Sequence, residues 1–350
     1  MIQIVTDTFN KYVFPELGDL TSNDLLLING YHGIINEQYY NNQKIVIYTC
    51  FGEICTDEEL VSHLNIFKKS FTIFLTTRDY LKEYENQYNC KIIKIPSAYA
   101  WYATQLPKFD LDLNFRSINK VFLSLNNRIQ WPRQALFQFI NQFDLLDKFY
   151  FSYHGGDRFN LGQKYVYDLT NQIIGNTWYN NQVDLEKLYN LIPVTTGIDY
   201  FDDYDWTIGN SDFYTKSFAS LVTETYIDEN NNVFFTEKIM KPLAYGHPFL
   251  VHSSAGALKK LKSLGFKTYS SIFDESYDDI ENPQQRFEAI LRQVLDICNK
   301  PLSELQNMYE SVKPIIQHNY EHFWYELPKI YQKDISEVKE QIKELIIRRG

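Results

Sequence analysis

Thr236, Glu237 and Lys238 stand side by side where an apolar run meets a predicted helix. Thr236 is a good helix N-cap, because its side-chain oxygen can accept a hydrogen bond from an N–H group of the first turn. Glu237 suits that turn, where the helix dipole is positive, whereas a cation such as Lys238 is unfavourable there. Lys238 becomes favourable when an anion such as a diphosphate docks on the helix N-terminus. These residues are therefore compatible with an ordinary capped helix and with a binding site for a phosphorylated ligand.

The residues that follow predict a helix over 237–245 and a strand over 248–252. Gly246 suits the position after the helix end, and Pro242 inside the helix removes one hydrogen bond and bends it. At such a strand-to-helix corner, Glu237 could accept hydrogen bonds from ribose hydroxyls, as acidic residues do in other nucleotide sites.

Short apolar runs alternate with helix-like stretches along the chain. Strands separated by helical patterns favour βαβ units and parallel sheets. The runs form two series, which predicts an α/β chain with two Rossmann-like, doubly wound domains. An amphipathic stretch over 133–149 predicts a helix. The strand-like runs are 2–5, 25–28, 44–49, 71–75, 91–95, 120–125, 150–153, 218–225 and 248–253.

The chain has 350 residues, more than one hydrophobic core ordinarily serves. We expect an N-terminal domain over 1–110, a C-terminal domain over 111–330 and a hinge within 96–119. The pattern of apolar residues in the tail over 331–350 predicts an amphipathic helix, and we expect it to pack back onto the N-terminal domain.

The composition of the chain indicates which binding partners and which cellular compartment to expect. The net charge is −10 and no basic block stands out, which argues against nucleic acid as the main partner. The four cysteines are too few and too scattered for a disulfide framework or a zinc cage. No run of 18 apolar residues occurs and the first residues lack the pattern of a signal peptide. A soluble, cytoplasmic protein without a transmembrane segment is the expectation.

The segment "VFFTEKIMKPLAYGHPFLV" resembles the donor-binding segment of the α1,3-fucosyltransferase family. That segment reads aromatic-Val-Thr-Glu-Lys, an apolar helix, then a Gly-x-x-Pro turn and a strand. "FASLVTET" is similar to the family's strand that carries a glutamate, which places Glu224 in the donor site, and "FLSLNNRIQWPRQALFQFI" resembles its strand, loop and arginine-led helix. The resemblance spans residues 118–325. It implies a GT-B-like fold, with two Rossmann-like domains facing a cleft, and an inverting, metal-independent glycosyltransferase.

The resemblance also assigns roles to single residues. It implies that Glu237 holds the nucleotide ribose, that Lys238 pairs with the diphosphate, and that Arg133 is a second diphosphate cation. Arg128 competes for that last role from the predicted loop over 126–128. The implied substrates are a nucleotide-sugar donor, with a GDP-sugar favoured, and a glycan acceptor; no metal or other cofactor is implied.

Phe234 stands where the family often has tyrosine, so a phenolic hydrogen bond to the donor is missing. The expected donor sugar is therefore fucose or a related sugar.

An inverting transfer needs a carboxylate that removes the proton of the acceptor hydroxyl. Ligands of doubly wound sheets meet the carboxyl ends of the strands, and Glu53 follows the strand-like run 44–49. Glu53 is the predicted base on that geometry, with Asp7 and Glu37 as rivals.

Two motifs compete with this interpretation. "DDYD" at 202–205 resembles a manganese-binding Asp-x-Asp, and "HNYEH" at 318–322 fits an inverted zinc-protease pattern. An acidic turn and a pair of helix-packing histidines are the expected explanations. A binding protein that kept the fold without the chemistry is the alternative function, and an enzyme that glycosylates nucleic acid is a minor one.

Overall fold

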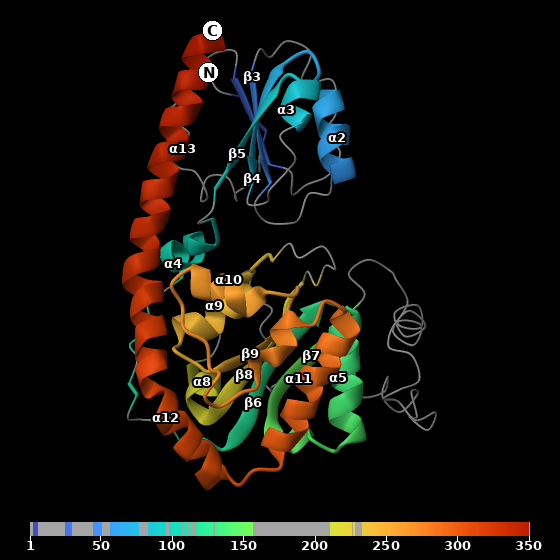
Figure 1. Cartoon of the computed structure of the whole chain (residues 1–350), viewed down its shortest axis with the longest axis vertical. Helices are drawn as coiled ribbons and strands as arrows, with labels where there is room; N and C mark the ends of the chain where they lie inside the picture. The colour runs from blue at the N-terminus through green and yellow to red at the C-terminus, as the bar shows by residue number, and fades with distance from the viewer. Residues whose placement is uncertain are drawn as a thin grey trace. The chain divides into compact units, whose positions relative to one another are not determined.

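A computed structural model gives the fold (Figure 1). The chain divides into two compact units, Met1–Gln105 with Tyr325–Gly350, and Leu106–Trp324. The residues that the structure describes are 3–5, 25–29, 45–50, 57–76, 83–95, 98–106, 108, 110, 112–113, 117–128, 130–156, 211–225, 227 and 233–349.

Unit 1 is built on a five-stranded sheet in which every neighbouring pair is parallel. The strands lie side by side in the order in which they occur along the chain, so the order of the described strands does not reverse anywhere in this sheet. They are β1 (Gln3–Val5), β2 (Leu25–Asn29), β3 (Ile45–Cys50), β4 (Phe71–Thr76) and β5 (Cys90–Lys94).

The core of unit 1 forms where the inner strands meet helix α2 (Asp57–Ile66). All six residues of β4 are buried, as expected for a parallel strand covered on both faces. Tyr48 and Phe74 stack with ring centroids 5.3 Å apart, and Leu60 and Leu64 of α2 belong to the same buried cluster.

The C-terminal helix α13 (Leu327–Arg349) belongs to unit 1 and contacts η4 (Ala98–Ala100) and α4 (Trp101–Gln105). Its buried stripe, Ile335, Val338 and Ile342, has helical spacing. The expectation that this helix packs back onto the N-terminal domain is confirmed. The remaining helix among the described residues of the unit is α3 (Glu83–Gln87).

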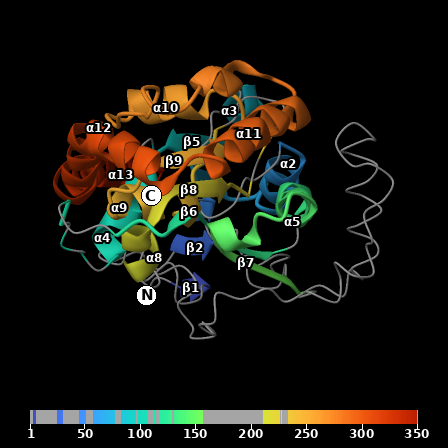
Figure 2. The same cartoon turned by 90° about the horizontal axis from the view of Figure 1, so that it is seen from below.

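Unit 2 carries a four-stranded parallel sheet in the order β7-β6-β8-β9 (Figure 2). Its strands are β6 (Lys120–Arg128), β7 (Phe149–Gly156), β8 (Ser217–Thr223) and β9 (Phe249–His252). The helical elements among its described residues are α5 (Trp131–Gln142), η5 (Leu146–Lys148), α8 (Ser211–Lys216), α9 (Glu237–Ala244), α10 (Ala257–Ser263), η7 (Glu275–Asp279), α11 (Pro283–Cys298) and α12 (Leu302–Glu321). The π-helical turn η8 (His322–Glu326) begins in this unit and continues past Trp324 into unit 1.

The α/β class with two parallel sheets, expected from the strand pattern and from the resemblance, is confirmed. All nine predicted strands are present. The helix predicted over 133–149 is wrong in length: α5 ends at Gln142, and Asp144 with a φ of 52° reverses the chain before β7 begins. Within the described part of the chain, every helix is too short or too polar to span a bilayer.

Two glycines with positive φ flank α10, and they allow the effect of steric crowding on stability to be tested. Gly265 has a φ of +93°, and a Cβ there would lie 2.6 Å from Cε1 of His322. Gly256 also has a positive φ, +78°, but no atom lies within 4 Å of its Cβ position. We expect Gly256→Ala to cost about 1–2 kcal/mol for the left-handed backbone. Gly265→Ala should cost about 1–3 kcal/mol more, because the methyl group also displaces the histidine ring.

Urea unfolding of the two variants measures the difference. Placing Gly265→Ala in a His322→Ala background should remove the additional cost. Equal destabilisation in both glycine variants would contradict the steric argument.

Candidate functional site

The strand order of unit 2 indicates where a ligand site lies. From β6 the chain moves to β7 on one side, and the later strands β8 and β9 lie on the other side of β6. Among the described strands this reversal places a topological switch point between β6 and β8. In open parallel sheets, ligands bind outside the carboxyl ends of the strands at such a point. The residues that end β6 and β8 are therefore the first to consider.

Glu224 directly follows β8 and is fully buried. Its Oε1 accepts hydrogen bonds from the backbone N–H groups of Thr236 (3.2 Å) and Ile239 (3.3 Å), and its Oε2 accepts one from the Thr236 hydroxyl. Burial raises the pKa of Glu224, while Lys238 and the bonds from Thr236 act in the opposite direction. The carboxyl group thus connects the end of β8 to the start of α9.

The N-terminus of α9 is capped by the protein itself. Thr236 is the N-cap, as predicted, and its Oγ1 accepts from the N–H of Lys238 at 3.3 Å. The next N–H, of Ile239, is bonded to Glu224. A diphosphate that docked on these N–H groups would have to displace both acceptors.

Glu237 and Lys238 pair with each other. Lys238 Nζ lies 2.6 Å from Glu237 Oε1 and also donates to Thr225 Oγ1 at 3.1 Å. The two side chains are 27% and 21% exposed, so a ligand can reach both. Burial acts to raise the pKa of Glu237, but the charge and hydrogen bond of Lys238, together with Lys241, outweigh it and lower the pKa to about 2.

Arg133 lies in the first turn of α5 and is only 1% exposed. Its Nη2 donates to the carbonyl oxygen of Thr223 at 3.4 Å, so its guanidinium group contacts the last residue of β8. Arg128 is the last residue of β6, opposite Gly156 of β7; nothing is described of its side chain. The loop predicted over 126–128 is wrong, since these residues extend the strand.

The other predicted residues are Phe234 and those that lie outside the described residues. Phe234 is half-buried in the segment directly before α9. The proposed base Glu53 and its rivals Asp7 and Glu37 lie outside the described residues, as does the motif at 202–205.

A buried polar network at the ends of β6 and β8 escaped the sequence analysis. Thr223 Oγ1 donates to Asn126 Oδ1 at 2.7 Å, and Asn126 Nδ2 donates to Ser124 Oγ at 3.1 Å. Ser124 Oγ in turn donates to the carbonyl of Leu221. The network fixes the two strand ends on either side of the switch point. Alternating serine, asparagine and threonine inside apolar strands is the signal that could have revealed it.

The two histidines of "HNYEH" bind backbone carbonyls. His318 Nε2 lies 2.8 Å from the oxygen of Gly265, and His322 Nε2 lies 2.7 Å from that of Leu264. Both rings therefore cap the end of α10 from α12 and η8. Within the described ranges, no group of three or more His, Cys, Asp or Glu side chains is arranged to hold a metal ion.

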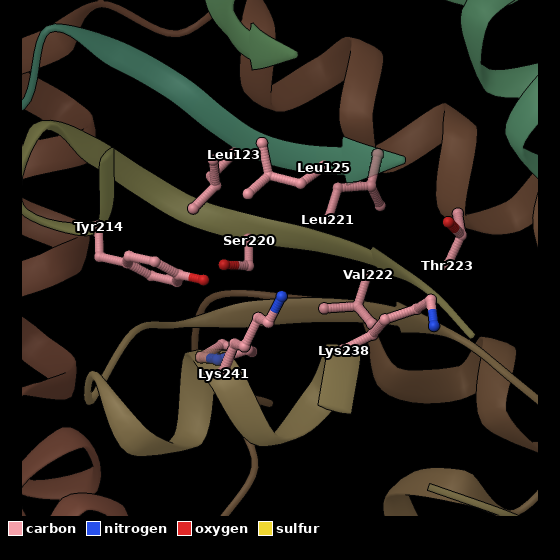
Figure 3. A pocket seen from close by; sticks show the side chains of 10 residues that line it. Leu123, Leu125, Tyr214, Ser220, Leu221, Val222, Thr223, Lys238 and Lys241 are labelled. Atoms are coloured by element: carbon pink, nitrogen blue, oxygen red, sulfur yellow. The ribbon is translucent and has the colours of Figure 1, made fainter. Parts of the chain in front are cut away.

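A pocket opens beside α9, with a cavity volume of about 50 Å³ (Figure 3). Lys238 and Lys241 reach it from the helix, and Tyr214 reaches it from α8. Burial raises the pKa of the Tyr214 hydroxyl, which therefore keeps its proton. The sequence analysis did not single out Lys241. The pocket is lined by Leu123, Leu125, Tyr214, Ser220, Leu221, Val222, Thr223, Lys238, Lys241 and Pro242.

No protein-family model matches the chain, and no curated protein matches it. Among solved structures, the chain is similar to an α,α-trehalose-phosphate synthase (UDP-forming) from Burkholderia vietnamiensis. The two are 12% identical with a TM-score of 0.41, over 97% of this chain and 80% of that one. A likeness this distant carries no argument about function, which rests on the chain's own residues.

The raised pKa of Glu224 predicts how stability depends on pH. Because the unfolded chain ionises this group first, stability that is present below its ordinary pKa of 4.5 is lost as the pH rises towards the folded-state pKa. The wild type should therefore lose free energy of unfolding relative to Glu224→Gln across that interval. Urea unfolding of both proteins from acid to neutral pH measures the difference. A difference that stays constant, or that favours the wild type as pH rises, would contradict the assignment.

Proposed function

We propose that this protein is an inverting, metal-independent glycosyltransferase that moves a sugar from a nucleotide-sugar donor to a glycan hydroxyl. One observation carries the proposal: Glu224, Glu237 and Lys238 gather at the carboxyl end of β8, beside the switch point of the sheet. The segment that contributes Glu237 and Lys238 is also the one that resembles the donor-binding segment of the α1,3-fucosyltransferases.

The roles of the binding residues follow from their exposure and charge. Lys238 is partly exposed and supplies a cation for the donor diphosphate, while Glu237 accepts hydrogen bonds from the ribose. Glu224 and Thr236 hold the helix that carries them. Arg133 and Arg128 stay as alternative sources of further positive charge.

The resemblance favours a GDP-sugar, with fucose or a related sugar as the transferred group. Phe234 cannot offer the phenolic hydroxyl that the family often has at this position. Glu53 is the proposed general base, which would remove the proton of the acceptor hydroxyl as the donor bond breaks.

Turnover in the presence of EDTA tests the reaction class. Incubation with GDP-, UDP- and dTDP-sugars should release a nucleoside diphosphate slowly by hydrolysis, and faster when a glycan acceptor is present. Thermal stabilisation by a nucleotide without turnover on any glycan would instead support a binding protein. Transfer that requires DNA or tRNA would support the nucleic-acid alternative.

Substitution of Lys238 tests the binding site. Lys238→Ala should weaken binding of GDP or UDP by about tenfold to a hundredfold, because a charge-assisted bond to phosphate is lost. Calorimetry measures the affinity, and Lys259→Ala removes an exposed lysine of α10 as the matched control. Glu237→Ala should weaken ribonucleotides more than inorganic pyrophosphate. If Lys238→Ala binds as tightly as wild type, the segment is an ordinary capped helix.

A further inference from the structure

Lys241 occupies a position in α9 to which the resemblance assigns no role. It follows Lys238 by three residues, a spacing that places two side chains on one face of a helix. Both lysines line the pocket beside α9, together with the hydroxyl-bearing residues Tyr214 and Thr223. In Figure 3, Lys241 extends from the helix towards Ser220 of β8, whereas Lys238 extends towards the end of that strand.

The charged side chains among the described residues that line the pocket are cations. Two lysines and no carboxylate are among the described residues that line it. The carboxylate beside them, Glu237, is bonded to Lys238 and also interacts electrostatically with Lys241. The second nearby carboxyl group, Glu224, is fully buried, and this burial raises its pKa. A pocket lined by two lysines suits an anionic group, which can accept charge-assisted hydrogen bonds from both ammonium groups.

The size of the pocket limits the ligand. A cavity volume of about 50 Å³ holds a group the size of a few water molecules, which is the scale of one phosphoryl group, and cannot enclose a nucleotide. Half of the lining residues are apolar, namely Leu123, Leu125, Leu221, Val222 and Pro242. Such a lining lowers the local dielectric constant and strengthens charge–charge attraction.

The helix N-terminus is a poor competitor for the same anion. The N–H groups of Lys238 and Ile239 are bonded to Thr236 and Glu224. An anion that approaches α9 is therefore recognised by the ammonium groups on the side of the helix.

We propose that the pocket beside α9 binds one phosphoryl group of a nucleoside diphosphate, with Lys241 as the second cation next to Lys238. The identification of the ligand as a nucleotide rests on the proposed function. The pocket itself requires only a phosphate-type anion. Lys241 would then contribute to donor affinity without touching the base or the ribose.

Calorimetry with three ligands tests this role: GDP, guanosine and inorganic pyrophosphate, with UDP and uridine in parallel. Lys241→Met keeps an unbranched side chain one atom shorter and removes its charge, Lys241→Arg keeps the charge, and Lys259→Met is the surface control. Lys241→Met should weaken diphosphate and pyrophosphate binding by about tenfold or more and leave the nucleosides unchanged. Lys241→Arg and Lys259→Met should bind like the wild type. Thermal unfolding confirms that each variant is folded.

The outcomes separate this inference from the proposed function. If Lys238→Ala weakens GDP or UDP while Lys241→Met does not, the role of Lys241 is overturned and the proposed function stands. If the wild type binds pyrophosphate through Lys241 but binds no nucleotide, the pocket stands and the proposed function fails. If folded wild type binds neither, both are overturned.

Discussion

The buried carboxyl group of Glu224 is the constraint on which the arrangement of the site depends. A desolvated carboxyl group is unfavourable unless donors surround it. Here the donors are the N–H and hydroxyl groups of Thr236 and the N–H of Ile239, all at the start of α9. The bonds fix the helix to the end of β8, and with it the positions of Lys238 and Lys241.

This arrangement changes how the site can recognise an anion. A free helix N-terminus binds phosphate through its backbone N–H groups and its dipole. In α9 an internal carboxyl group already occupies that place, so in the site that we propose an anion would be recognised by side chains on the flank of the helix. Side chains discriminate between ligands by their charge and length. In the proposed site, the two lysines would therefore contribute more to anion affinity than the backbone N–H groups.

The sequence was most informative where the signal is local. The β runs and the cap at Thr236 were predictable because alternation and capping involve neighbouring residues. The length of α5 was not, since the apolar spacing continues to Leu146 although the helix ends at Gln142. The periodicity indicates which residues share an apolar face, but it does not indicate where the helix ends and the backbone turns. In this chain the turn is at Asp144.

The candidate site was predictable only in part, for the same reason. Glu224 and Thr236 lie twelve residues apart in sequence, and no pattern shows that one caps the other. The network of Asn126 and Thr223 joins strands 97 residues apart, so it became visible only when the sheet was in view. Lys241 escaped notice because a lysine in the last turn of a helix is ordinarily explained by the helix dipole.

Helix α9 is too short to hold its own shape. Eight residues fall below the length at which isolated helices are stable, and Pro242 removes one further hydrogen bond. Tertiary bonds replace this missing stability at both ends: Glu224 binds the first turn, and Trp324 Nε1 donates to the carbonyl of Ala244 at 2.9 Å. Trp324 is also the last residue of unit 2 before the chain enters unit 1. The two lysines are therefore placed by contacts outside their own helix, and a change at Trp324 would reach the site through α9.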